Sequence, residues 1–322
     1  MKLGVLTNLY GNLSLEEALI KFKALGIEAV EIGCGGYPGN AHCNPKVLLN
    51  DGAALKDWLA LIDKYGMELA ALSVHGNAVH PNPDIAKKFH DDFTDAVLLA
   101  ERIGIDTVIT FSGCPGGSRE DNTPNWVTCP WPEDFLCVLD YQWNEVLIPY
   151  WKKAAAFASA HGVKKIAFEM HPGFCVYNPE TLLRLRREVG DVIGANLDPS
   201  HLIWQGIDPV AAIRELRGAI YHFHAKDTKV DKYNSARNGV LDTKHYGDEA
   251  NRSWIFRSVG YGNGLDYWRD IISALRLSGY DKVMSIEHED SLMTPDEGLA
   301  HAVRFLRDSI IKEPKPTTMS WA

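Results

Sequence analysis

Short apolar runs alternate with longer amphipathic stretches along almost the whole chain, and this alternation restricts the fold more than any other feature. Between the runs, apolar residues recur every three to four positions, a pattern typical of helices. The first such stretch, SLEEALIKFKALG, has Ser14 and Glu17 in the spacing of a capping box and ends at Gly26. The runs themselves have the length and side chains of strands, and we count eight: residues 3–7, 28–32, 68–74, 106–111, 165–170, 192–198, 219–225 and 282–288.

Eight strand–helix pairs predict a parallel sheet, because a parallel strand follows its neighbour only after a crossover connection. Eight is also the number at which such a sheet closes, so we predict an α/β fold with one (β/α)₈ TIM barrel domain over residues 1–322. A doubly wound open sheet is the competing architecture. Residues 112–142 and 227–262 lack clear periodicity. We expect them to form long loops after strands 4 and 7, at the barrel end where chemistry takes place.

Composition and charge narrow the classes of partner. The chain has 33 Lys and Arg against 42 Asp and Glu, a net charge of −9, which argues against a nucleic-acid partner. No apolar run approaches the ~18 residues of a membrane span, so no membrane partner is expected. The six cysteines include no C-x-x-C pair, and the first residues do not have the pattern of a secretory leader. We therefore expect a reducing, cytoplasmic location.

Polar residues occupy one face of the predicted strands toward their carboxyl ends. The other face is apolar, and we expect its members, Phe111 and Phe168 among them, to face the helices. Charged groups inside a barrel cost several kcal/mol each unless they are paired or bound to an ion. So many carboxylates at one end therefore predict a cation. The polar series is Glu31, Ser73, His75, Thr110, Ser112, Glu169, His171, Asn196, Asp198, His222, His224, Glu287 and Glu289.

Four members of this series form the sharpest candidate metal site. Glu169, Asp198, His224 and Glu287 each stand at the end of one of strands five to eight. Taken singly, each residue is more often a partner in a salt bridge or a helix cap, and only the set favours a metal. Three carboxylates and one imidazole suit one divalent ion, for which we expect Mn²⁺, with Mg²⁺, Co²⁺ or Zn²⁺ as alternatives.

This site predicts proton transfer next to a carbonyl group. A divalent ion held by a carbonyl oxygen and a neighbouring hydroxyl stabilises the charge that develops when the intervening C–H loses its proton. Glu169 and Glu287, three strands apart, are expected to reach opposite faces of a sugar, so that one removes and the other returns a proton. His171 is an alternative base, or a group that orients a carboxylate. A leaving group on the next carbon would turn the same step into an elimination.

Aromatic residues in the loops favour a carbohydrate as the small-molecule substrate. Trp131 follows strand four and Trp204 follows strand six, where flat apolar faces can stack on the C–H face of a sugar ring. A single Trp is more often a packing residue. Such aromatics suit a contact between copies of the chain, in a homo-oligomer, as well as they suit a ligand.

Four segments carry a resemblance to a known superfamily. FEMHPG, NLDPSHL, HFHAKD and SIEHED, in this order with a strand–helix unit between each, resemble the sugar phosphate isomerase/epimerase superfamily of xylose-isomerase-like barrels. The resemblance covers nearly the whole chain. It implies that Glu169, Asp198, His224 and Glu287 hold one divalent ion, and that His201 contacts the substrate or assists the site. The superfamily includes ketose 3-epimerases, inosose isomerases and dehydratases, and repair enzymes of the endonuclease IV type.

The chain departs from two members of that superfamily. The repair enzymes use three metal ions with extra histidines; His75 stands at one matching strand end, but Phe111 and Ser112 stand where another His is found. Together with the net charge, this disfavours DNA incision. Ketose 3-epimerases have an arginine soon after the strand-seven His, whereas this chain offers Lys226 and Lys229. We count His75 and Lys226 among the candidate substrate-binding residues.

The resulting hypothesis is a metal-dependent isomerase or epimerase that acts on a sugar or keto-sugar. The alternative is a metal-dependent lyase that eliminates from a 3-keto glycoside or inosose, which the missing arginine and the long 227–262 insertion favour. A barrel that has lost turnover and serves as a binding subunit is a third reading. The intact set of metal-ligand residues argues against it.

Overall fold

Eight parallel strands close into a barrel, as predicted. The computed structural model describes residues 1–314 and 318; the rest of the predicted 1–322 domain, residues 315–317 and 319–322, lies outside the described residues. Around the barrel the order is β1-β10-β7-β6-β5-β4-β3-β2, and β1 pairs with both β2 and β10. Each strand lies within about two residues of its predicted run: β1 (Lys2–Leu6), β2 (Ala29–Gly33), β3 (Glu68–Ser73), β4 (Thr107–Thr110), β5 (Lys165–Glu169), β6 (Ile193–Leu197), β7 (Ile220–Ala225) and β10 (Val283–Ile286).

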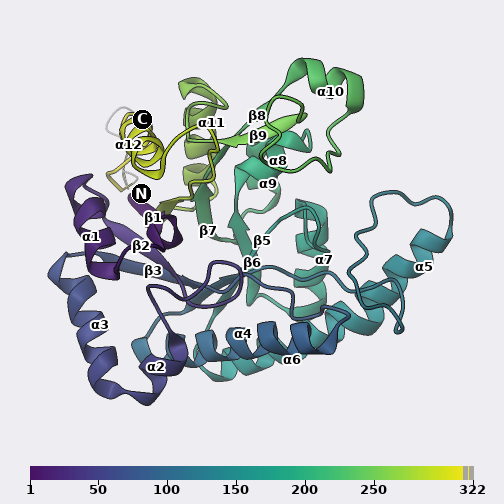
Figure 1. The fold of residues 1–322 in the computed structure, drawn as a ribbon, viewed down its shortest axis with the longest axis horizontal. Helices are drawn as coiled ribbons and strands as arrows, with labels where there is room; N and C mark the ends of the chain where they lie inside the picture. The colour runs from purple at the N-terminus through teal and green to yellow at the C-terminus, as the bar shows by residue number, and fades with distance from the viewer. Residues whose placement is uncertain (315–317, 319–322) are drawn as a thin grey trace.

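Helices surround the barrel (Figure 1). The predicted capping box is present, since the Ser14 side chain accepts from the backbone N–H of Glu17 and the Glu17 side chain accepts from that of Ser14. Gly26 follows that helix with a φ of +66°, a conformation that favours glycine. The helices are η1 (Thr7–Tyr10), α1 (Leu15–Ala24), α2 (Pro45–Asn50), α3 (Gly52–Lys64), α4 (Pro83–Ile103), α5 (Asp134–Asp140), η2 (Tyr141–Leu147), α6 (Ile148–Ala160), α7 (Pro179–Val189), α8 (Pro199–Trp204), α9 (Pro209–Glu215), α10 (Lys232–Asn238), α11 (Leu265–Leu277) and α12 (Pro295–Arg307).

The strand faces follow the predicted alternation except in β4. There Ile109 packs inside the barrel with Ala71 and Ala167, and the register pairs Thr110 with Phe168, a residue of the outer layer. The prediction that Phe111 faces the helices is therefore wrong: its ring contacts those of His75 and His171 at the mouth of the barrel. The Thr110 hydroxyl donates instead to the carbonyl of Val74, so its polarity is satisfied by backbone.

The barrel interior is layered. Ala71, Ile109 and Ala167 form a small apolar cluster, separate from the large cluster between the strands and the helices. Toward the carboxyl ends of the strands the interior becomes polar, with Glu31 and Asn196 both fully buried. Side chains therefore fill the barrel, and the polar groups are concentrated where the strands end.

The two aperiodic stretches differ in structure. Residues 227–262 were expected to be a loop, but they contain an antiparallel pair, β8 (Asp227–Val230) with β9 (Trp254–Arg257), and the helix α10 between them. The strands are short and pair only with each other, which explains why periodicity missed them. Figure 1 shows this hairpin and α10 extending beyond the ring, and α5 at the end of a long loop elsewhere on the rim. Both insertions follow carboxyl ends of strands, as predicted.

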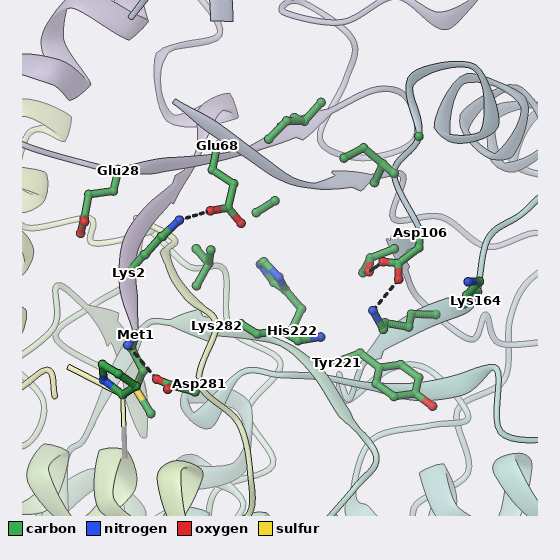
Figure 2. A pocket seen from close by; sticks show the side chains of 18 of the residues that line it. Met1, Lys2, Glu28, Glu68, Asp106, Lys164, Tyr221, His222, Asp281 and Lys282 are labelled. Atoms are coloured by element: carbon green, nitrogen blue, oxygen red, sulfur yellow. Dashed lines mark hydrogen bonds and ion pairs between the residues drawn. The ribbon is translucent and has the colours of Figure 1, made fainter. Parts of the chain in front are cut away.

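The opposite end of the barrel holds a cavity of about 870 Å³. Figure 2 shows it lined by charged residues such as Lys2, Glu68 and Asp106, several of which form ion pairs, and by His222. Within residues 1–314 and 318, no helix has both the length and the apolar composition that crossing a membrane requires.

Candidate metal centre

Four predicted ligands converge at the carboxyl ends of the strands. Glu169, Asp198, His224 and Glu287 each offer one ligand atom, and these atoms all lie within 4.8 Å of one another. They come from the ends of β5, β6, β7 and β10, three consecutive neighbour pairs of the barrel. Parallel strands bring their ends to one rim, so residues far apart in sequence meet there. The predicted convergence is confirmed.

The two carboxylate oxygens of Asp198 have different roles: one caps a helix and the other faces the candidate metal site. It is the N-cap of α8, where its Oδ1 accepts from the backbone N–H of Ser200 at 2.8 Å and Pro199 occupies the first helical position. Its Oδ2 is buried and accepts no hydrogen bond from the described residues. The helix therefore fixes the carboxylate with one oxygen left to face the cluster.

Two histidines hold Glu169. His201 lies in the first turn of α8, and its Nε2 is 2.9 Å from Glu169 Oε1. His75, after β3, places its Nε2 2.9 Å from Glu169 Oε2. Burial raises the pKa of Glu169, but its contacts with the imidazoles of His201, His224 and His75 outweigh burial, and the pKa lies well below its ordinary range. Both predicted substrate-binding histidines therefore contact a candidate ligand directly.

His224 faces the cluster through one nitrogen only. Its Nε2 lies 3.0 Å from both oxygens of Glu31, a buried carboxylate on β2. Its Nδ1 lies 3.1 Å from Glu287 Oε2 and 3.3 Å from Glu169 Oε2, without the alignment of a hydrogen bond. A carboxylate behind a histidine commonly orients the other ring nitrogen toward a metal. The structure thus leaves Nδ1 as the nitrogen available to an ion.

Glu31 is a functional candidate to which the sequence analysis assigned no role beyond its place on the polar strand face. Its carboxylate contacts the imidazoles of His222 and His224 and accepts hydrogen bonds from the hydroxyls of Ser73 and Ser285. Glu31 and His222 belong to the polar face noted in the sequence. That position was the available signal, but β2 and β7 are not neighbours in the barrel, so spacing alone did not pair them.

Lys226 lies against the candidate ligands. Its Nζ is 2.8 Å from Glu287 Oε2, 2.9 Å from Glu289 Oε2 and 3.1 Å from Asp198 Oδ2. Burial lowers its pKa, but the surrounding carboxylates, Asp198 first, outweigh burial and keep the lysine charged. Lys226 was predicted to bind substrate, and its ammonium group lies at the cluster of candidate metal ligands.

The donors at this mouth fit a divalent ion. Burial, together with the charges of Glu169 and Glu287, raises the pKa of Asp198 to about 7 despite the nearby lysine. The carboxylates of Asp198, Glu287 and Glu289 also outnumber the one ammonium group of Lys226 that they share. Two of the candidate ligand atoms, Asp198 Oδ2 and His224 Nδ1, are also buried without hydrogen-bond partners among the described residues. A dication at this point would satisfy both atoms and offset the excess charge.

Two cavities lie near the centre and share His171 and Tyr246 as lining residues. The first, here called the Phe lobe, has a volume of about 470 Å³. The second, the Trp lobe, has a volume of about 520 Å³ and includes His201 and the predicted Trp204. The other lining side chains are Tyr37, Phe111, Phe174, Ile255, Phe256, Glu289 and Ser291 in the Phe lobe, and Trp126, Thr128, Pro172, Leu241, Asp242, Thr243 and Trp254 in the Trp lobe.

One predicted substrate-binding residue lies apart from these cavities. Trp131 is 75 % exposed on the long loop before α5, and it lines neither lobe. That loop leaves the rim and carries the side chain away from the cluster, whereas Trp204 is held in α8 next to His201. The structure therefore does not bring Trp131 to the centre, and its role stays a prediction.

Comparisons with curated proteins place relatives across nearly the whole chain. The chain is 42 % identical over 313 residues to the "Uncharacterized protein YfiH" of Bacillus subtilis (strain 168), covering 96 % of this chain and 99 % of that protein. It is 26 % identical to the "Rhizopine catabolism protein MocC" of Rhizobium meliloti, over 92 % of this chain and 80 % of that protein. It is 23 % identical to an "Inosose dehydratase" of Mesomycoplasma hyopneumoniae (strain 7448), over 93 % and 90 %.

Solved structures agree on the fold. A "D-tagatose 3-epimerase-like protein" superposes with a TM-score of 0.64 at 21 % identity, covering 96 % of this chain and 98 % of that chain. The "IOLI protein with a binding zinc atom" also gives 0.64, at 18 % identity and the same coverage. The family described as "Xylose isomerase-like TIM barrel" matches residues 19–309. The chain belongs to this family.

Proposed function

We propose that this chain is a divalent-metal-dependent isomerase or epimerase that removes a proton next to the carbonyl group of a sugar or keto-sugar. The observation that carries the proposal is the convergence of four candidate ligand atoms within 4.8 Å, at the rim where barrel enzymes have their active sites. Buried, excess negative charge at that rim supports it. Family membership and relatives named for sugar-like substrates point the same way.

Glu169, Asp198, His224 and Glu287 would hold the ion. Three oxygen donors to one nitrogen favour Mn²⁺, with Mg²⁺, Co²⁺ or Zn²⁺ as alternatives. When bound, such an ion supplies positive charge that stabilises the negative charge developing on substrate oxygens. The carboxylate of Glu31 would keep His224 in the required orientation.

The proton steps are assigned to two carboxylates. Glu287 keeps 12 % of its side chain exposed and would remove the proton, whereas both oxygens of Glu169 contact histidines. Glu169, supplied with a proton by the histidines His75 or His201 that contact it, would return a proton from the other side, which inverts the carbon. His171, which lines both lobes, is the alternative base. Lys226 would place its ammonium group beside the substrate oxygen that gains charge.

A lyase is the second candidate function. The curated relative named inosose dehydratase favours it, as does a mouth with two separate lobes, which has room for a leaving group. The same base would remove the proton in both reactions. The fate of the neighbouring substituent distinguishes them.

Metal content tests both candidates. Purified protein, freed of metal with a chelator and then dialysed against Mn²⁺, should retain about one equivalent per chain by elemental analysis, because one cluster of this kind is proposed. Asp198→Asn should strongly reduce the amount of Mn²⁺ retained. The matched change Asp106→Asn, at the opposite end of the barrel, should leave it unchanged. A wild-type chain that retains no divalent ion would refute both functions.

Proton exchange then identifies the reaction. The Mn²⁺-loaded protein is incubated in D₂O with D-tagatose, D-psicose, D-fructose and an inosose, and deuterium next to the carbonyl is followed by NMR. Incorporation without loss of water supports the isomerase, and loss of water supports the lyase. Glu169→Gln and Glu287→Gln should each abolish exchange, with Glu68→Gln as the control. Full exchange in both site variants would exclude the two-carboxylate mechanism.

A further inference from the structure

Lysines gather in the cavity at the amino-terminal end of the barrel, opposite the candidate metal centre. The cavity has a volume of about 870 Å³, within the range of about 300–1,000 Å³ that is usual for small-molecule sites. The chain as a whole has a net charge of −9, so a group of lysines in one cavity is a local exception. Among the residues that the structure describes, the charged lining consists of Lys2, Lys164, Lys165, Lys282, Lys312, Glu28, Glu68, Asp106 and Asp281.

Two of the four carboxylates are paired with lysines of the same cavity. Glu68 lies 2.5 Å from the ammonium nitrogen of Lys2, and Asp106 lies 2.6 Å from that of Lys165 (Figure 2). The hydroxyl of Thr107 also donates a hydrogen bond to Asp106. Each of these carboxylates therefore already has a cation of its own.

The other two carboxylates have partners outside this group of lysines. Asp281 lies 2.8 Å from the amino group of Met1 and pairs with the guanidinium group of Arg276. Glu28 accepts a hydrogen bond from the backbone N–H of Leu3. Within residues 1–314 and 318, three lysines of the lining therefore have no carboxylate at ion-pair distance, and these are Lys164, Lys282 and Lys312.

Lys282 stands beside a second positive charge. Burial, followed by the charge of the neighbouring Lys165, lowers the pKa of Lys282, and the charge of Asp106 only partly opposes this. Because Lys165 already engages Asp106, two ammonium groups share one carboxylate. Like charges repel, most strongly where water is partly excluded. An anion between the two ammonium groups would relieve this repulsion.

The cavity extends from these lysines into the barrel. Its lining includes His222 of β7, which is only 3 % exposed and has its Nε2 2.8 Å from Glu31 Oε2. Figure 2 shows the imidazole of His222 and the side chain of Lys282 in the same cavity. A ligand held by the lysines would therefore sit in a recess with a buried wall, where charge pairing is screened less than on an open surface.

We propose that this cavity binds the phosphate group of a small molecule, with Lys165 and Lys282 as its first contacts. Lysine is a common ligand of phosphate, and a phosphate monoester carries a charge of about −1.5 to −2 at neutral pH, which one ammonium group cannot neutralise. The free phosphate ion and a phosphorylated metabolite share this chemistry. The site does not depend on the proposed function, because its lysines lie at the opposite end of the barrel from the candidate metal ligands.

Calorimetric titration tests the site. The full chain is freed of metal with a chelator and dialysed, so that no metal ion is present to bind phosphate. Inorganic phosphate, glucose 6-phosphate and AMP are the probes, and glucose and adenosine are their uncharged counterparts. At least one phosphate probe should bind, at least tenfold more tightly than glucose or adenosine. The same affinity for all three probes identifies the free ion as the ligand, and tighter binding of glucose 6-phosphate or AMP identifies a phosphorylated metabolite.

Four variants locate the binding. Lys282→Met should weaken it at least tenfold, and Lys165→Met should act in the same direction. Asp106→Asn should strengthen it, because a carboxylate that competes for the two lysines is removed. Lys56→Met is the matched control, since Lys56 is an exposed lysine of α3 outside the cavity, and it should leave the affinity unchanged.

Three results would overturn the proposal. The first is that none of the three phosphate probes binds, or that none binds more tightly than glucose and adenosine. The second is undiminished affinity in folded Lys282→Met and Lys165→Met. The third is an equal loss of affinity in Lys56→Met, which would reduce the effect to the net charge of the chain. The folded state of each variant is checked by circular dichroism.

Discussion

The two ends of the barrel differ in how their charged side chains are paired and how far they are buried. At the amino-terminal end, Lys2 pairs with Glu68 at 2.5 Å and Lys165 pairs with Asp106 at 2.6 Å, and all four side chains are partly exposed (Figure 2). At the carboxyl-terminal end, Lys226 is buried and shared by three carboxylates, of which Asp198 is buried, Glu287 is 12 % exposed and Glu289 is 48 % exposed. The cavity at the first end is the larger, about 870 Å³. Uncompensated buried charge therefore marks the candidate site better than cavity size does.

The comparison is tested most severely by removing one lysine at each end. Lys226→Met should destabilise the metal-free chain by about 3–5 kcal/mol, because it leaves buried carboxylates without their cation. Lys2→Met should cost less than about 1 kcal/mol, since its pair with Glu68 is exposed. Equilibrium urea unfolding in a chelator measures both, and added Mn²⁺ should reduce the loss in Lys226→Met alone. Equal losses of unfolding free energy in the two variants would contradict the difference between the two ends of the barrel.

Removing the charge of Glu31, the carboxylate that contacts His224, should have a smaller effect, this time on metal affinity. Glu31→Gln should weaken Mn²⁺ binding about 10- to 100-fold, as loss of a group that orients a metal ligand commonly does. This corresponds to about 1.4–2.7 kcal/mol. Glu28→Gln, three residues earlier at the other end of the barrel, is the control and should leave the affinity unchanged. Calorimetric titration of folded protein with Mn²⁺ gives both values. Unchanged affinity in Glu31→Gln would mean that His224 does not need this contact.

The smallest effect is expected at the exposed pair of Asp106 and Lys165. Burial raises the pKa of Asp106, but hydrogen bonds from Lys165 and Thr107 outweigh it, and the pKa falls below the ordinary 3.8. The ionised form is thus favoured by folding, so the stabilisation is present above pH 3.8 and is lost as the pH falls through the lowered pKa. Asp106→Asn should cost less than about 1 kcal/mol at neutral pH and less still near pH 3. Unfolding free energies across that range check this, and a cost that grows in acid would contradict it.

Periodicity and strand-end chemistry were enough to predict the barrel and the four converging residues. The strands are continuous in sequence, and parallel strands place their ends at one rim, so neither inference needed a long-range contact. The orientation of β4 was missed because Thr110 is polar yet faces outward, where the carbonyl of Val74 accepts its hydrogen bond. The hairpin was missed because β8 and β9 are short and separated by more than twenty residues of chain.

Contacts across the barrel could not be predicted in the same way. Glu31 meets His224 from a strand that is not adjacent to β7, so nothing in local spacing connects them. Lys226 was predicted to bind substrate. Its ion pairs with Asp198 and Glu287 depend on the packing of different strands and could not be predicted from the sequence.

Three alternate residues, two in β7 and one directly after it, place their side chains at three levels along the barrel axis. His222 lines the amino-terminal cavity, His224 faces the candidate ligands, and Lys226 reaches the carboxylates at the rim. A slip of one position would turn all three away together and push Tyr221 and Phe223 into the barrel. The length of this strand therefore cannot change by a single residue without disrupting both ends of the barrel at once.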